Sequence, residues 1–260
     1  MTAAIFSDVN EADNTATVLS ASSQAGNLSI SNVANSIVGR VWRTTVLTAW
    51  GQADFVTDKT IDVAALVFAR TAGLPLAGTV QHQFDANGGT AGTGAADDSG
   101  AISIGAADGY GYHVYKPSAS VTARYWRWTY SITGVTFVDT GRAWAGAAFQ
   151  PGVDIDFNDP DDWGDLSVIS QAARSGAEFV DERPRQRRMA FSLSALSDSD
   201  RISTRDIKRR IGTAKQILVV KNPASFAKET ILGRAVATVP LVHRGISDLY
   251  STTFVIRESL

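Results

Sequence analysis

The stretch that decides the fold reads Arg124-Tyr125-Trp126-Arg127-Trp128-Thr129-Tyr130. Its aromatic and polar residues alternate with a period of two, which is typical of a β-strand with one buried face. The alternation places Arg124, Trp126, Trp128 and Tyr130 on one face. It directs Tyr125, Arg127 and Thr129 to the other. Each large ring buries roughly 150–250 Å², so three rings on one strand are enough to anchor the core of a β-sandwich.

A second segment, residues 137–149, contains Gly141-Arg142-Ala143-Trp144-Ala145-Gly146. Its small residues allow another backbone to approach closely. We expect this segment to pair with the first as the closing strands of the sandwich. Four tryptophans are expected in the core, and the alternative is a sugar-stacking platform. These four are Trp42, Trp126, Trp128 and Trp144.

Composition excludes several classes of protein. The chain has 260 residues, 44% of them hydrophobic, a formal net charge of −2 and no cysteine. The absence of cysteine excludes disulfides, thiolate zinc sites and a cysteine nucleophile. A net charge this close to zero gives no overall electrostatic attraction to nucleic acid. The start of the sequence lacks the pattern of a signal peptide. We expect a protein made in the cytosol that inserts in no membrane and binds no nucleic acid.

The chain is predicted to have four parts. Residues 1–29 are an N-terminal arm whose apolar pieces are so short that a neighbouring subunit is expected to order them. Residues 30–152 form the β-sandwich, residues 153–182 an acidic linker, and residues 183–260 an α+β docking domain. In the last part, Ser197 is the predicted N-cap of a helix that ends before Gly212, and residues 216–220 form a buried strand.

A family resemblance follows from motifs in a particular order. Val41-Trp42-Arg43-Thr44, Ala65-Leu66-Val67-Phe68 and Ala123-Arg124-Tyr125-Trp126-Arg127-Trp128 resemble discoidin-like, galactose-binding-like jelly rolls. The segment Gly141 to Gly146 resembles the version found in structural proteins of tailed bacteriophages. The later motifs Leu196-Ser197, Ile217 to Pro223 and Leu232-Gly233-Arg234 resemble the region that follows the jelly roll in those proteins.

The resemblance implies a mainly β chain, with a jelly-roll β-sandwich followed by a smaller α+β domain. It also implies a virion structural protein of a tailed bacteriophage, in the tail tip or baseplate, made in the host cytoplasm. The implied partners are other tail proteins, copies of this chain in a ring, and a host-surface glycan. The alternative is a carbohydrate-binding module of a host-recognition protein, and a remote third interpretation is a glycan-degrading enzyme.

Two groups of residues are candidate binding sites. Three tyrosines flank a Gly-rich stretch between residues 85 and 107 and could contact sugar or protein, or equally could pack within a sheet. An arginine-rich segment is expected to contact the acidic residues 159–165 of a neighbouring copy, head to tail. These residues are Tyr110, Tyr112 and Tyr115, and Arg183, Arg185, Arg187 and Arg188.

No pattern indicates catalysis, a cofactor or a metal. His82, His113 and His243 stand apart, and no Gly-x-Ser-x-Gly elbow is present. Asp154, Asp156, Asn158 and Asp165 have the spacing of positions 1, 3, 5 and 12 of a calcium loop. However, Asp159 replaces the turn glycine, so a solvated linker is the better interpretation. We predict that the chain is not an enzyme.

Overall fold

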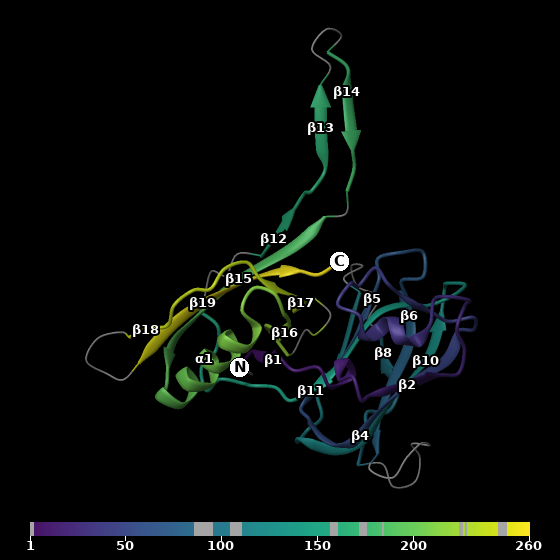
Figure 1. The fold of residues 1–260 in the computed structure, drawn as a ribbon, viewed down its shortest axis with the longest axis horizontal. Helices are drawn as coiled ribbons and strands as arrows, with labels where there is room; N and C mark the ends of the chain where they lie inside the picture. The colour runs from purple at the N-terminus through teal and green to yellow at the C-terminus, as the bar shows by residue number, and fades with distance from the viewer. Residues whose placement is uncertain are drawn as a thin grey trace. The chain divides into compact units, whose positions relative to one another are not determined.

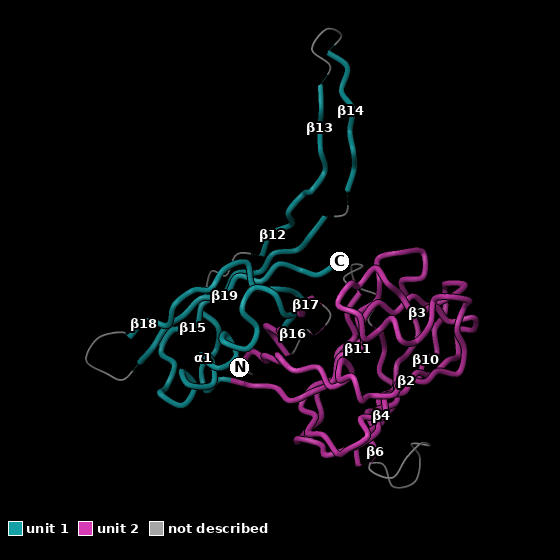
Figure 2. Tube along the Cα trace, viewed as in Figure 1, with its two compact units in different colours: residues 1, 151–217, 231–259 teal, residues 2–150, 218–230, 260 magenta. Residues whose placement is uncertain are grey.

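The computed structural model of the chain describes residues 3–85, 96–104, 111–156, 161–171, 176–183, 185–223, 226, 228–243 and 249–260. The chain divides into two compact units, which Figure 2 shows in different colours. The sandwich unit comprises residues 2–150, 218–230 and 260. The C-terminal unit comprises residues 1, 151–217 and 231–259.

Two antiparallel sheets form a jelly-roll β-sandwich (Figure 1). The first has the order β2-β4-β10-β6-β7, with β8 also paired to β6, and the second has the order β3-β11-β5-β9. The strands of the first sheet are β2 (Val18–Ala21), β4 (Thr48–Ile61), β6 (Ala77–Asp85), β7 (Asp97–Asp98), β8 (Ile102–Ser103) and β10 (Val121–Thr133). Those of the second are β3 (Trp42–Arg43), β5 (Val63–Phe68), β9 (Tyr112–Tyr115) and β11 (Asp139–Gly146). Two 3₁₀ helices, η1 (Glu11–Asp13) and η2 (Ile30–Ala34), precede β3.

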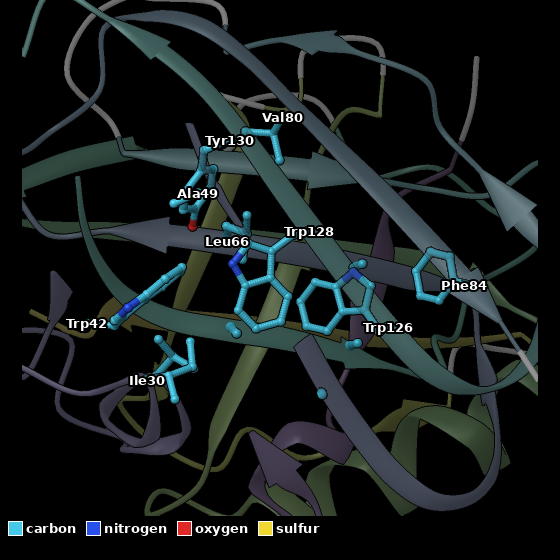
Figure 3. Packing of buried hydrophobic residues seen from close by; sticks show 14 of the residues in the cluster. Ile30, Trp42, Ala49, Leu66, Val80, Phe84, Trp126, Trp128 and Tyr130 are labelled. Atoms are coloured by element: carbon cyan, nitrogen blue, oxygen red, sulfur yellow. The ribbon is translucent and has the colours of Figure 1, made fainter. Parts of the chain in front are cut away.

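The sandwich core is built on the alternation in β10. Trp126, Trp128 and Tyr130 are completely buried, and Figure 3 shows Trp42, Trp128 and Trp126 in a row that continues to Phe84. The ring centroids of Trp126 and Trp128 lie 4.6 Å apart. Gly51 on β4 makes room for them, because a Cβ atom there would lie 2.4 Å from the Trp128 ring. The prediction that the four tryptophans are buried is confirmed. Trp42, Trp126 and Trp128 belong to the sandwich core, whereas Trp144 lies on the opposite side of β11, against Ser7.

The predicted pairing of the two closing strands is wrong. β10 pairs with β4 and β6, whereas β11 lies in the other sheet between β3 and β5. The small residues of β11 do allow another backbone to approach closely. The approaching backbone is the segment before β3, not β10. A Cβ atom at Gly141 would lie 2.2 Å from the carbonyl oxygen of Val38.

Residues 3–29 are part of the sandwich unit rather than an arm. Ile5–Ser7 forms β1, which pairs with residues 218–220, and β2 pairs with β4. Ser7 Oγ accepts a hydrogen bond from Trp144 Nε1 at 2.9 Å. The carboxylate of Asp13 accepts two hydrogen bonds from the buried guanidinium of Arg142. The short apolar pieces therefore find partners inside the same chain, and no neighbouring subunit is needed to order them.

The C-terminal unit is built around one antiparallel sheet and one helix. The strands β16, β17, β19, β15 and β12 follow one another in this order, and β18 pairs with β19. The predicted helix is confirmed, with Ser197 Oγ accepting the Asp200 N–H at its start and Gly212 at its end with φ 51°. The elements are β12 (Asp161–Gly164), β15 (Gln186–Leu196), α1 (Asp198–Ile211), β16 (Gln216–Val220), β17 (Thr230–Ala235), β18 (Val242–His243) and β19 (Tyr250–Glu258).

The predicted acidic linker contains strands instead. Asp161 to Gly164 form β12, which pairs with residues 186–189 of β15. β13 (Val168–Gln171) and β14 (Glu178–Asp181) then form a two-stranded hairpin. Figures 1 and 2 show this hairpin extending past the ends of β12 and β15. Asp161 and Asp162 therefore stand in the β12–β15 ladder rather than in a linker.

Candidate functional site

The candidate site is the outer face of the first sandwich sheet. From Trp126 to Ile132, the alternation buries the even-numbered residues of β10 and turns its odd-numbered residues outward. The register shift between Ala123 and Tyr125 turns Arg124 outward as well, so its predicted place on the buried face is wrong. The strand register places Arg127 between Gln52 of β4 and Gln83 of β6, and it places Asp98 of β7 beside Gln83. In the next row, Thr129 lies between Trp50 and Gln81. We call Trp50, Gln52, Gln81, Gln83, Asp98, Arg127 and Thr129 the outer-face cluster.

Arg127 occupies the centre of the outer-face cluster. Its Nε donates to Gln52 Oε1 at 3.0 Å, and its guanidinium carbon lies 4.4 Å from the centroid of the Trp50 ring. This cation–π contact holds both side chains in fixed positions. Burial lowers the pKa of Arg127 below its ordinary value, but an arginine remains charged at neutral pH. The centre of the cluster is therefore a fixed, partly desolvated positive charge beside an indole.

Asp98 organises the other side of the cluster. Its carboxylate accepts hydrogen bonds from Gln81 Nε2 at 2.8 Å, from Gln83 Nε2 at 2.9 Å and from the backbone N–H of Gly100 at 2.8 Å. Burial alone would raise the pKa of Asp98, but these hydrogen bonds outweigh it and the pKa lies below the usual range. Because the NH₂ group of Gln81 is directed at Asp98, its Oε1 is turned away and can accept from an external hydroxyl, whereas Gln83 is buried and supports Asp98 from below.

The register also brings an ion pair to the edge of the outer-face cluster. Arg124 donates to the two carboxylate oxygens of Asp54 at 2.7 and 2.9 Å, in a bidentate fork. The Arg124 guanidinium also lies over the Tyr125 ring, 4.9 Å from its centroid. The face thus presents indole, phenol, amide, carboxylate and guanidinium groups, each held by a neighbouring side chain.

A separate hollow of about 340 Å³ lies at the turn between β4 and β5. Asp62, Lys116, Ser120 and Gln150 provide its polar lining. Asp62 is already engaged, because it accepts from the Ser120 hydroxyl and from the backbone N–H of Ala148. This hollow contains no aromatic ring, so the outer-face cluster is the better candidate for a ligand with both polar and apolar faces.

The tyrosines that the sequence singled out do not form an exposed row. Tyr110 lies outside the described residues. Tyr112 is only 4% exposed, and Tyr115 is half-buried, with its hydroxyl donating to Asp97 at 2.6 Å. They are three residues apart on β9, so they point to opposite faces of that strand. Tyr112 packs inside the sandwich, whereas a sugar or protein contact through Tyr115 stays a prediction.

The arginine-rich segment finds its acidic partner within the same chain. The guanidinium of Arg187 is 2% exposed and binds Asp161 on the adjacent strand β12, with Nε 2.9 Å from Oδ1. Arg183 is exposed and pairs with Asp181, while Arg185 lies 4.0 Å from Asp165. Arg188 is exposed. The β12–β15 register thus brings these opposite charges together within one chain, and the expected head-to-tail contact between copies stays a prediction.

Two histidines that stand apart in the sequence meet in the core. His82 Nε2 and His113 Nδ1 lie 3.0 Å apart, and Trp126 Nε1 donates to His82 Nδ1 at 3.2 Å. Burial lowers the pKa of both imidazoles, that of His113 to about 4. The pair lies in the interior and is not reachable by a ligand. The described ranges hold no group of three metal-ligating side chains, and none of their helices is long and apolar enough to cross a membrane.

Asp154 and Asp156 of the calcium-like spacing are described, whereas Asn158 lies outside the described residues. The carboxylate of Asp156 accepts from the backbone N–H and the hydroxyl of Ser194, at 3.2 and 2.6 Å. This carboxylate therefore fastens the start of the C-terminal unit to β15.

No protein-family model matches this sequence, and no curated protein matches it. Among solved structures, the module CBM32-5 of Clostridium perfringens in complex with GalNAc-β-1,3-galactose is similar at 12% identity and a TM-score of 0.43, covering 54% of this chain and 100% of that one. The family 32 module of Clostridium perfringens NanJ in complex with galactose is similar at 13% identity and a TM-score of 0.42, covering 54% and 98%. The lectin domain of lectinolysin complexed with Lewis B antigen is similar at 16% identity and a TM-score of 0.41, covering 53% of this chain and 95% of that one. TM-scores this low decide nothing about the function of this chain.

Proposed function

We propose that the chain is a non-catalytic saccharide-binding protein and that the outer-face cluster is its binding surface. The observation that carries this proposal is the half-buried Trp50 ring, fixed by Arg127 next to Gln81, Gln83 and Asp98. A pyranose has an apolar C–H face that suits an indole, and hydroxyls that need paired donors and acceptors. The cluster supplies both. The ordering of its side chains before binding reduces the entropy cost.

The test is a glycan array followed by calorimetric titration of the best-bound sugar. Trp50→Ala should weaken binding at least about tenfold, the equivalent of roughly 1.4 kcal/mol. Gln81→Ala should weaken it by less, since Asp98 keeps its bond from Gln83. Trp163→Ala is the matched control, because Trp163 is also accessible to a ligand, and is exposed, but lies on β12 of the C-terminal unit. The proposal fails if no sugar binds, or if the two tryptophan variants weaken binding equally.

The second candidate is a structural subunit in the tail tip or baseplate of a tailed bacteriophage, carried in the virion. The feature that favours an assembly subunit is the β13–β14 hairpin, whose described residues are all exposed. Its test is whether the protein sediments with purified phage particles and is released with tail components. Neither candidate includes a catalytic step, so a mixture of glycans should be recovered unchanged after incubation with the protein.

A further inference from the structure

The β13–β14 hairpin is a two-stranded sheet with no third strand among the described residues. Ile169 of β13 pairs with Val180 of β14, and these side chains are 67% and 61% exposed. Phe179, on the opposite face, is 62% exposed. A lone two-stranded hairpin is marginally stable in water, and exposed aliphatic and aromatic side chains on both of its faces add to that cost. Pairing with a further strand would therefore stabilise the hairpin and cover its exposed side chains.

The two edges of the hairpin differ in charge. β14 carries Glu178 and Asp181, and Asp181 is further bonded to Arg183. Charged side chains of this kind protect an edge strand against pairing. β13 reads Val168-Ile169-Ser170-Gln171 and has no charged residue. The uncharged β13 edge is thus the one open to another strand.

We propose that a second copy of this chain occupies that edge, with β13 pairing antiparallel to β13 of the other copy about a two-fold axis. Residues that face each other across an antiparallel pair lie on the same side of the sheet. If the axis passes beside Ile169, that residue meets its own counterpart, and Val168 meets Ser170 of the second copy. The four strands then carry one continuous aliphatic row of Val180, Ile169, and the same two residues of the second copy.

Charge favours pairing between the two β13 strands over pairing between the two β14 strands, which is the other symmetric arrangement. Pairing β14 with itself would bring Glu178 and Asp181 of both copies, four carboxylates, to one junction. Pairing β13 with itself brings no charge together, and it leaves the acidic strands at the outer edges of the four-stranded sheet. Such an isologous contact closes on itself and yields a dimer rather than a filament.

The absence of cysteine allows a direct test on the full-length protein. In the proposed dimer the two Ile169 positions are directly opposed, within the range that a disulfide spans. Ile169→Cys should therefore form a disulfide-linked dimer on mild oxidation. Val180→Cys is the matched control, since it has the same face and nearly the same exposure. The two copies of residue 180 would lie three strand spacings apart, roughly 14 Å, which is too far for a disulfide.

Light scattering on the unmodified protein should give about twice its 27.6 kDa mass at high concentration. Ile169→Lys should reduce that to the monomer mass while leaving the melting temperature unchanged. Cross-linking through Val180→Cys instead would move the contact to the β14 edge and overturn the proposal. So would a monomeric unmodified protein at up to roughly 1 mM, or an Ile169→Lys variant that remains dimeric.

Discussion

At the scale of single residues, the buried histidine pair places the strictest demand on the sandwich core. Trp126 donates to His82 Nδ1, so this nitrogen must be an unprotonated acceptor. A neutral His82 then carries its proton on Nε2 and donates it to His113 Nδ1. Adding a proton to either ring would place a second donor where an acceptor is required. The native core therefore requires both imidazoles to be neutral.

Stability should consequently depend on pH in a defined window. A solvent-exposed histidine has an ordinary pKa of 6.5, and the pKa values of His82 and His113 lie below it in the native protein, that of His113 at about 4. Between these values the unfolded chain binds protons that the native core excludes. The free energy of unfolding should therefore fall as pH drops from about 6.5 toward 4, by at most about 1.4 kcal/mol per pH unit for each histidine. Urea denaturation at pH 7, 6 and 5 measures the slope.

Other titratable groups lie beside the histidine pair, so a variant without the two imidazoles is needed as a control. Tyr115 stacks on His82 and donates to Asp97. A His82→Phe/His113→Phe variant keeps two stacked rings but removes both imidazoles, so its slope between pH 7 and 5 should be nearly flat. An unchanged slope in that variant would assign the pH dependence to other groups.

Trp126 offers a second prediction at this scale. Trp126→Ala should lower the free energy of unfolding by about 3–5 kcal/mol, because it removes a fully buried ring and leaves a cavity. Trp50→Ala, on the outer face, should cost less, since that ring is only half-buried. Chemical denaturation of both variants checks the order. Equal losses would contradict the assignment of the two rings to different faces.

At the scale of elements, one buried ion pair fastens β12 to β15. The guanidinium of Arg187 is bonded to Asp161, and the backbone N–H of Arg187 donates to Glu258 of β19 at 3.2 Å. The neighbouring Arg188 projects into solvent. Two adjacent arginines of β15 thus have opposite roles, because consecutive residues of a strand face opposite sides.

Arg187→Ala should lower the free energy of unfolding by about 1–3 kcal/mol, with Asp161 losing its partner. This expected loss of stability is smaller than for a fully buried ion pair because the side chain of Asp161 is 35% exposed. Arg188→Ala should change stability by less than about 0.5 kcal/mol. Protease digestion should also cut residues 161–183 faster in the first variant. Similar behaviour of the two variants would refute the role given to Arg187.

Elements with a strong local signal could be predicted from the sequence. The period of β10 fixes which of its residues are buried, and the Ser197 and Gly212 caps fix α1. The partner of β11, the His82–His113 contact and the Arg187–Asp161 pair could not be predicted, since they depend on strand order and register. Only part of the outer-face cluster could be predicted from the sequence. The alternation shows that Arg127 turns outward, but only the strand register brings Gln83 and Asp98 to it.

At the scale of the whole molecule, two segments that are more than 200 residues apart in the sequence complete the sandwich unit. Ile5 and Phe6 are buried and pair with Val220 and Val219. Asp13 neutralises Arg142, which is almost fully buried. The first residues of the chain therefore close the fold rather than decorate it.

Deleting residues 1–13 should therefore unfold the sandwich unit, with loss of near-ultraviolet circular dichroism and of a cooperative melting transition. The physical reason is the loss of β1 together with the only carboxylate bonded to the Arg142 guanidinium among the described residues. Asp13→Ala is the milder variant and should melt at a lower temperature while remaining folded. A truncated protein that melts like the full chain would show that these residues are an arm after all.

The pairing of β1 with residues 218–220 also has a consequence for protein synthesis. A ribosome adding 5–20 residues per second needs roughly 10 to 40 s to proceed from residue 7 to residue 218. During that interval Ile5 and Phe6 lack their β16 partners, and only the isolated bridge between Phe6 and Phe149 can hold β1 in place. The β1 edge that later pairs with β16 should thus stay exposed to other chains and to chaperones until translation of β16 is complete.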